Sequence, residues 1–129
     1  MMNMKNFLRF LIKGDLMRQV EPTIKYIKGR KRCEKRGLNL TLLDDVIHIL
    51  STRQFTDAEI VKYKVHNLSG RFKGYQELHL GNRNSNWLLV YRVIGNKVLF
   101  EDTYVSLENT GTHDECLGSE EFENELVWL

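Results

Sequence analysis

The sequence is poor in the residues that mark special classes of protein. It has one proline and two cysteines among 129 residues, and no repeat or low-complexity segment. Cys33 and Cys116 lie far apart without a CxxC pair, which indicates a reduced, cytoplasmic protein, with a single disulfide as the alternative. The opening residues 1–17 are interrupted by Arg9 and Lys13 and lack a small-residue cleavage site, so they predict neither a signal peptide nor a membrane-spanning helix.

What the chain does contain is ordinary in composition but uneven in charge. Its length fits one domain with a single core. Residues 1–73 carry 16 Lys and Arg against 7 Asp and Glu, whereas residues 74–129 carry 3 against 10. The stretch KYIKGRKRCEKR holds seven cations and one acid in twelve positions. It indicates either a surface for nucleic acid or a solvated helix face.

The first half of the chain predicts a strand and a helix. A short strand is expected over residues 16–21. A helix follows, with Thr23 as N-cap and Gly37 in the C′ position. Its apolar seam is thin and contains a glycine, so packing must hold it: the residues are Tyr26, Ile27, Cys33 and Gly29.

A second helix is expected within residues 38–52, because apolar residues recur there at i, i+3, i+4 and i+7: Leu43, Val46, Ile47 and Leu50. Either Asn39 or a capping box of Thr41 and Asp44 would begin it. The stretch TDAE predicts one further helical turn.

The second half predicts three antiparallel strands, YQELHL, WLLVYRVI and KVLFEDTYVSL, separated by turn signals. The pair Gly95-Asn96 predicts a tight hairpin. The predicted fold class is therefore α+β, in the order β-α-α-β-β-β. The expected organisation is an N-terminal extension over residues 1–15, a domain over residues 16–118 and an acidic tail over residues 119–129.

Three of the four histidines lie where this fold would let them converge. His66 precedes a turn, His79 lies on the first strand of the meander, and His113 follows the last strand. His48 lies inside the second helix and is interpreted as structural or exposed. Histidines near a basic face suggest acid–base chemistry on a phosphodiester. No Asp or Glu cluster with metal-ligand spacing accompanies them, so no metal is expected.

The segments YKVHNLSGRFKGYQELHL, NWLLVYRV and NTGTHDECLG, together with the basic KRCEKRG, resemble the YafQ branch of the RelE/ParE toxin superfamily. The resemblance covers about residues 16–118. It implies a small twisted antiparallel sheet with two N-terminal helices packed on it. It also implies the toxin of a type II toxin–antitoxin pair, a ribosome-dependent endoribonuclease without cofactor that cuts mRNA. Its partners would be an antitoxin, the ribosome and mRNA, and no membrane.

The resemblance also suggests a role for each candidate residue. His113 would be the general acid toward the leaving 5′-oxygen and His79 the base for the 2′-hydroxyl, while His66 assists or binds the phosphate. The substrate pocket would be shaped by Arg83, Asn86, Trp87 and Asn109. Ribosomal RNA phosphates would meet seven cations: Lys25, Lys28, Arg30, Lys31, Arg32, Lys35 and Arg36. Tyr75 and Tyr91 are expected to serve the core rather than to stack on bases.

The sequence departs from the family pattern at several working positions. Asn86 stands where the family has an acid, and Asn109 where it has the arginine of its Arg-Thr-Gly motif. Cys116 and Leu117 replace Leu-Phe, and Gln76 replaces an arginine. Two hypotheses follow: Arg83, in a turn lengthened by about three residues, supplies the missing cation, or the domain is a weakened enzyme that serves as an antitoxin-binding module. A gyrase poison is a third, weaker alternative, because such proteins do not need these histidines.

Overall fold

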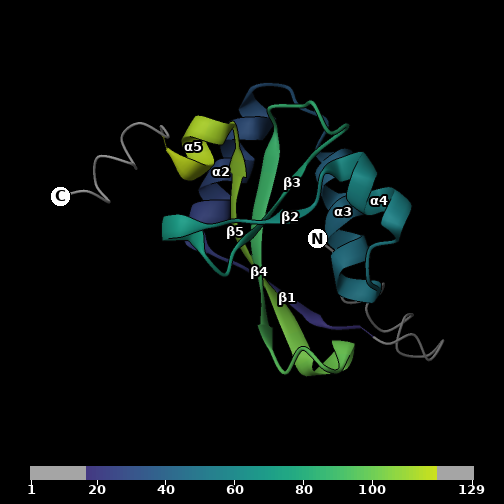
Figure 1. Ribbon diagram of the computed structural model, residues 1–129. Coiled ribbons are helices and arrows are strands. Elements are labelled where there is room, and N and C mark those ends of the chain that lie inside the picture. Colours follow the sequence, from purple (N-terminus) through teal and green to yellow (C-terminus); the bar gives the residue numbers. More distant parts are fainter. Residues whose placement is uncertain (1–16, 119–129) are drawn as a thin grey trace, which may run out of the picture.

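The computed structural model describes residues 17–118, so the expected N-terminal extension and acidic tail lie outside the described residues. Figure 1 shows the α+β arrangement that the sequence predicts. The elements are, in chain order, β1 (Gln19–Pro22), α2 (Ile24–Lys35), α3 (Leu40–Thr52), α4 (Asp57–Tyr63), β2 (His66–Asn67), η1 (Gly70–Phe72), β3 (Gln76–His79), β4 (Leu88–Gly95), η2 (Phe100–Asp102), β5 (Thr103–Gly111) and α5 (His113–Leu117).

The strands form one sheet in the order β1-β5-β4-β3-β2. The predicted meander is present, because β2, β3, β4 and β5 pair antiparallel in succession. The sheet is nevertheless mixed, because β1 pairs parallel with β5. The prediction of a purely antiparallel sheet is therefore wrong at this edge. The chain between β1 and β5 contains α2, α3 and α4 as well as β2, β3 and β4, so it is long enough to return in the parallel direction.

The predicted tight hairpin at Gly95-Asn96 is also wrong. Gly95 pairs with Thr103, so the connection runs through residues 96–102 and includes the 3₁₀ turn η2. Gly95 has φ 116°, and a Cβ there would lie 2.4 Å from the carbonyl oxygen of Asp102. The glycine therefore serves a close approach at the strand end rather than a two-residue turn.

The helix starts follow their capping residues. Thr23 caps α2 by accepting from Tyr26 N, as expected, and Gly37 follows the helix with φ 77°. Asn39 caps α3, so the earlier of the two predicted starts is correct. The single turn expected near TDAE is a seven-residue helix, α4, with a full capping box between Thr56 and Glu59.

The sheet buries side chains on both faces. On one face, residues of α2 and α3 pack against Leu78, Leu89 and Val105 of the sheet. On the other, Leu88 and Val90 form a smaller cluster with α5 and with the segment between β2 and β3. Figure 1 shows α2 near α5 at one end of the sheet, and α3 beside α4. No helix within residues 17–118 is both long enough and apolar enough to cross a membrane.

Gly29, which weakens α2 by propensity, is needed for its packing. The residue is buried, and a Cβ added to it would lie 2.4 Å from the backbone oxygen of Thr110. Tyr26 and Cys33 are buried on the same helix, whereas Ile27 is 40% exposed. Tertiary contact with β5 thus overrides local helix propensity here.

Candidate active site

The site begins with two neighbouring strands, β2 and β3. His66 pairs directly with Glu77, and Glu77 lies two residues before His79 on β3. Because side chains alternate along a strand and face their cross-strand partners, all three project on the same face of the sheet. The imidazole rings of His66 and His79 lie 6.3 Å apart, centroid to centroid.

Glu77 lies between the two histidines. Its Oε1 atom is 3.4 Å from Nε2 of His66 and 3.4 Å from Nε2 of His79. The residue is only 4% exposed, and its second oxygen, Oε2, is buried without a hydrogen-bond partner. A buried carboxylate is stable only when charge or protons compensate it. The three side chains therefore form one coupled unit.

The backbone fixes the tautomer of both histidines. Nδ1 of His66 lies 2.7 Å from the carbonyl oxygen of Lys64, and Nδ1 of His79 lies 2.6 Å from that of Ser85. A carbonyl oxygen only accepts, so each Nδ1 carries the proton and donates it. In the neutral form each Nε2 would direct a lone pair at the Glu77 carboxylate. Nε2 is therefore the nitrogen of each ring without a backbone partner, and in both rings it faces Glu77.

His113 lies at the same end of the sheet. Leu88 pairs with His79 on one side and with Gly111 on the other, which places those two residues about 10 Å apart, or two strand spacings. His113 follows Gly111 by two residues as the first residue of α5, and its side chain is half exposed. His113 therefore follows the last strand, as the sequence predicts, and its side chain is accessible there.

The turn over residues 80–86 joins the two halves of the site. Ser85 accepts the bond from His79 Nδ1, and the next residue, Asn86, accepts at Oδ1 from the backbone N–H of His113 at 3.0 Å. Asn86 thus holds the start of α5 through an acceptor oxygen that an aspartate would also offer. Arg83 is exposed in the same turn.

Trp87 and Asn109 lie in the interior. Trp87 is 8% exposed and donates from Nε1 to Thr110 Oγ1 at 3.0 Å. Asn109 is 3% exposed, and its Nδ2 donates to the carbonyl oxygen of Glu115 at 3.3 Å. Both side chains are buried and bond to the end of β5 or to α5, so they do not face solvent. Tyr91, 1% exposed, belongs to the core.

The seven cations of α2 and its C-cap fall into two groups. Arg30 forms a two-bond ion pair with Asp44, and Arg36 does the same with Glu115. Arg32 Nε lies 3.1 Å from the same Glu115 carboxylate. The arginines are therefore committed to ion pairs within the fold. The lysines are exposed and carry the free positive charge: Lys25, Lys28, Lys31 and Lys35.

Glu115 connects the basic helix to the histidine helix. Its carboxylate also accepts from the backbone N–H of Thr112 and completes the capping box of α5. The Arg36 guanidinium, with this backbone bond, lowers the pKa of Glu115 to about 2. The ion pair is partly exposed, so solvent reduces its energetic weight. Its geometric effect is to fix α5, and with it His113, against α2.

Glu77 is the site residue that the sequence interpretation missed. The histidines appeared to lack a carboxylate, although ELH has the i, i+2 spacing that places an acid and a histidine on one strand face. The missing information was the pairing of β2 with β3, which adds His66 to that face. Among residues 17–118, no group of three or more His, Cys, Asp or Glu is arranged to hold a metal ion. Cys33 and Cys116 are free and buried, and burial raises the pKa of Cys116 to about 12.

This arrangement defines a small α+β protein with a histidine–carboxylate cluster on one face of its sheet and a lysine-rich helix, α2, packed on the other face. The chain belongs to the family described as "Bacterial toxin of type II toxin-antitoxin system, YafQ", whose sequence pattern matches residues 18–118. The expected family and fold are confirmed.

Individual relatives agree with this assignment. The chain is 27% identical over 103 residues to the mRNA interferase toxin YafQ of Escherichia coli strain K12, covering 80% of this chain and 99% of the relative. The crystal structure of YafQ from E. coli strain BL21(DE3) superposes with a TM-score of 0.63 at 25% identity, over 78% of this chain and 99% of that one. YafQ in the E. coli DinJ–YafQ toxin–antitoxin complex gives 0.59 at 27% identity, over 78% and 98%.

Proposed function

We propose that this protein is an endoribonuclease toxin that cleaves mRNA at the ribosome and is neutralised by a cognate antitoxin. The observation that carries the proposal is the cluster of His66, Glu77 and His79, with His113 joined to it through one turn. The similarity to a curated mRNA interferase supports the reaction, and the DinJ–YafQ complex supports a protein partner.

The chemistry needs a base, an acid and positive charge, and it needs no metal, because the RNA 2′-hydroxyl is an internal nucleophile. His79 accepts the 2′-hydroxyl proton at Nε2, and Glu77 stabilises the imidazolium that forms. His66, the more exposed of the pair, assists His79 or binds the phosphate. His113 donates a proton to the leaving 5′-oxygen. Oxygen attack and leaving-group protonation thus use separate histidines.

The charge on the phosphate must also be offset without the family arginine, because Asn109 occupies its place. The exposed Arg83 supplies this charge from the turn that joins His79 to the start of α5. The free lysines of α2 hold ribosomal RNA phosphates, which contribute salt-dependent affinity without sequence information.

Primer extension on a reporter mRNA after controlled expression tests the proposal. Wild-type protein should produce new 5′ ends within the coding sequence, and His79→Gln and His113→Gln should remove them. His48→Gln is the matched control, because His48 lies exposed on α3, which contributes no residue to the cluster on β2 and β3. Cleavage that survives both site substitutions would contradict the assigned chemistry.

A second candidate function is an antitoxin-binding module with little or no nuclease activity. It is favoured by Asn109, which is buried and engaged with α5 where the family carries a cation. In the same experiment this module would give no cleavage from wild-type protein, while retaining antitoxin binding.

A further inference from the structure

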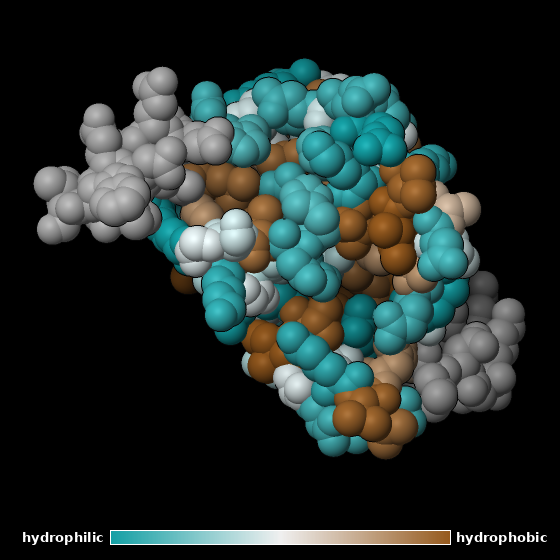
Figure 2. Space-filling model, in the orientation of Figure 1, coloured by the Kyte–Doolittle hydropathy of each residue, from teal (hydrophilic) through white to brown (hydrophobic). Residues whose placement is uncertain are grey.

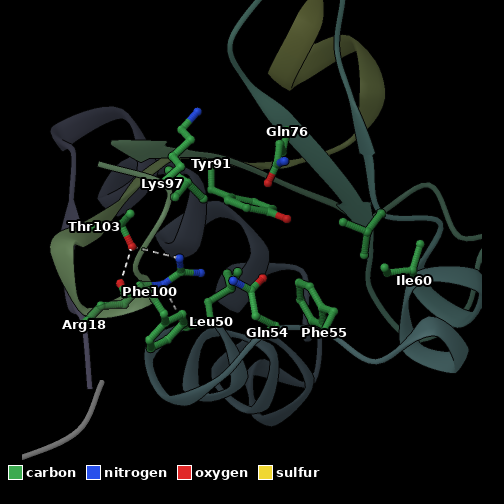
Figure 3. A pocket seen from close by; sticks show the side chains of 12 residues that line it. Arg18, Leu50, Gln54, Phe55, Ile60, Gln76, Tyr91, Lys97, Phe100 and Thr103 are labelled. Atoms are coloured by element: carbon green, nitrogen blue, oxygen red, sulfur yellow. Dashed lines mark hydrogen bonds between the residues drawn. The ribbon is translucent and has the colours of Figure 1, made fainter. Parts of the chain in front are cut away.

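A pocket of about 330 Å³ opens on the sheet face opposite the histidines. Tyr91 and Val93 of β4 form its floor, and Phe55 and Ile60 line it from the α3–α4 connection and α4. Figure 3 shows Tyr91, Phe55 and Ile60 around the cavity, with Arg18 and Phe100 at one end. Neither His66, His79 nor His113 lines it. An occupant can therefore fill it without touching the candidate active site.

Arg18 is the unusual group in this pocket. It is 8% exposed, and burial lowers its pKa. Its Nε donates to the carbonyl oxygen of Leu50 at 2.6 Å and its Nη1 to Thr103 Oγ1 at 3.1 Å, with the guanidinium 4.4 Å from the centre of the Phe100 ring. No carboxylate among residues 17–118 forms an ion pair with it, and its Nη2 has no hydrogen bond there. A buried guanidinium is normally compensated by an acid, so the pocket offers a position for one.

The surface around the pocket is also positively charged and apolar. Lys97 is a second cation among the lining residues, and Figure 3 shows its side chain extending outward, away from Arg18. Next to the lining residues lie exposed apolar side chains on both sides: Val61 at 60%, Val98 at 87% and Leu99 at 49% exposure. Figure 2 shows brown surface over α4 and over the β4–β5 connection. An apolar surface wider than the cavity fits a polypeptide segment better than a small ion.

We propose that this pocket docks an acidic segment of the antitoxin, with one apolar side chain in the cavity and a carboxylate of the same segment on Arg18. The inference rests on the proposed function, because it takes the partner from there. Charge selects this occupant over residues 1–16 of the chain itself, which are apolar but carry three cations and one acid. Arg18 and Lys97 would repel that segment and attract an acidic one.

Two surface variants test the pocket without disturbing the core. Lys97→Glu reverses a rim charge, and Gln54→Trp fills the opening from an exposed position. Lys62→Glu is the control, because Lys62 is on α4 but does not line the pocket. Titration calorimetry with the purified antitoxin should show at least a tenfold higher Kd for both pocket variants and less than a twofold change for the control. Growth inhibition without antitoxin should be unchanged in all three.

Hydrogen exchange locates the contact independently. Antitoxin binding to wild-type protein should protect amides in residues 50–60 and 97–103. Wild-type affinities retained by both variants, with protection confined elsewhere, would overturn the docking site while leaving the proposed function intact. Faster hydrogen exchange of the same amides after deletion of residues 1–16, measured without antitoxin, would identify the chain's own segment as the occupant of the pocket. That result would refute an acidic partner segment. Absence of any antitoxin binding to wild-type protein would remove both the proposed partner and this site.

Discussion

Replacing Glu77 by glutamine should separate activity from stability. The substitution keeps the size of the side chain and removes a charge whose Oε1 atom lies 3.4 Å from two imidazole nitrogens. At an effective dielectric constant near 20, one such charge pair is worth about 5 kcal/mol before desolvation is counted. That attraction is present only when a histidine is protonated, as it is after proton transfer from the 2′-hydroxyl.

The folded state does not depend on this attraction to the same degree. Burying the carboxylate costs several kcal/mol, which offsets most of the Coulomb gain, and its Oε2 atom is buried without a partner. The amide of the variant can donate to the lone pair at Nε2 of a neutral His66 or His79. The free energy of unfolding of Glu77→Gln should therefore stay within about 1 kcal/mol of wild type or rise, a Tm change of at most about 4 °C.

Catalysis should respond much more strongly. Loss of the group that stabilises the developing imidazolium should reduce single-turnover cleavage of ribosome-bound mRNA by about 100-fold or more. Glu59→Gln is the control, since the Glu59 carboxylate belongs to the capping box of α4 and pairs with Arg53 rather than with a histidine. Cleavage within twofold of wild type, or a loss of more than about 2 kcal/mol of stability, would refute the reasoning.

Three further outcomes are expected. His113→Ala should abolish growth inhibition while antitoxin binding, measured by copurification, remains; undiminished toxicity would refute its role. Replacing Lys28, Lys31 and Lys35 by glutamine should weaken copelleting with ribosomes and reduce the slope of log K against log salt concentration by about 2 to 3. An unchanged slope would show that the basic face of α2 is only solvated and binds no RNA. The pKa of Glu115 is lowered from 4.5 to about 2, so its ion pair contributes fully to the free energy of unfolding above pH 4.5, and this contribution is lost as pH falls toward about 2. Glu115→Gln should therefore reduce the dependence of the free energy of unfolding on pH in that window. An unchanged pH dependence would contradict this linkage.

Local signals predicted the helices well because caps and apolar spacing act within one or two turns. Thr23 and Asn39 begin α2 and α3, and the seam from Leu43 to Leu50 is buried as expected. The Gly95-Asn96 signal failed for a different reason. A two-residue hairpin would have changed the register of β5 against β4, and β5 is fixed instead by its buried residues Val105 and Leu107.

The tertiary structure also changed the interpretation of the candidate cations. As sequence, the three arginines and four lysines of the basic segment are equivalent. Asp44 on α3 and Glu115 on α5 select the arginines as partners, because the planar guanidinium pairs with a carboxylate through two bonds. No spacing rule within α2 contains that information.

The sequence by itself determined the family, the α+β class and the three histidines, because a motif and an apolar period are properties of neighbouring positions. Only the tertiary structure decided which groups meet them. Glu77 joins His66 because β2 pairs with β3, and Asn86 holds His113 because a turn from one strand end reaches the next helix. These are contacts across 11 and 27 residues of chain, and register and packing, rather than local preference, set them.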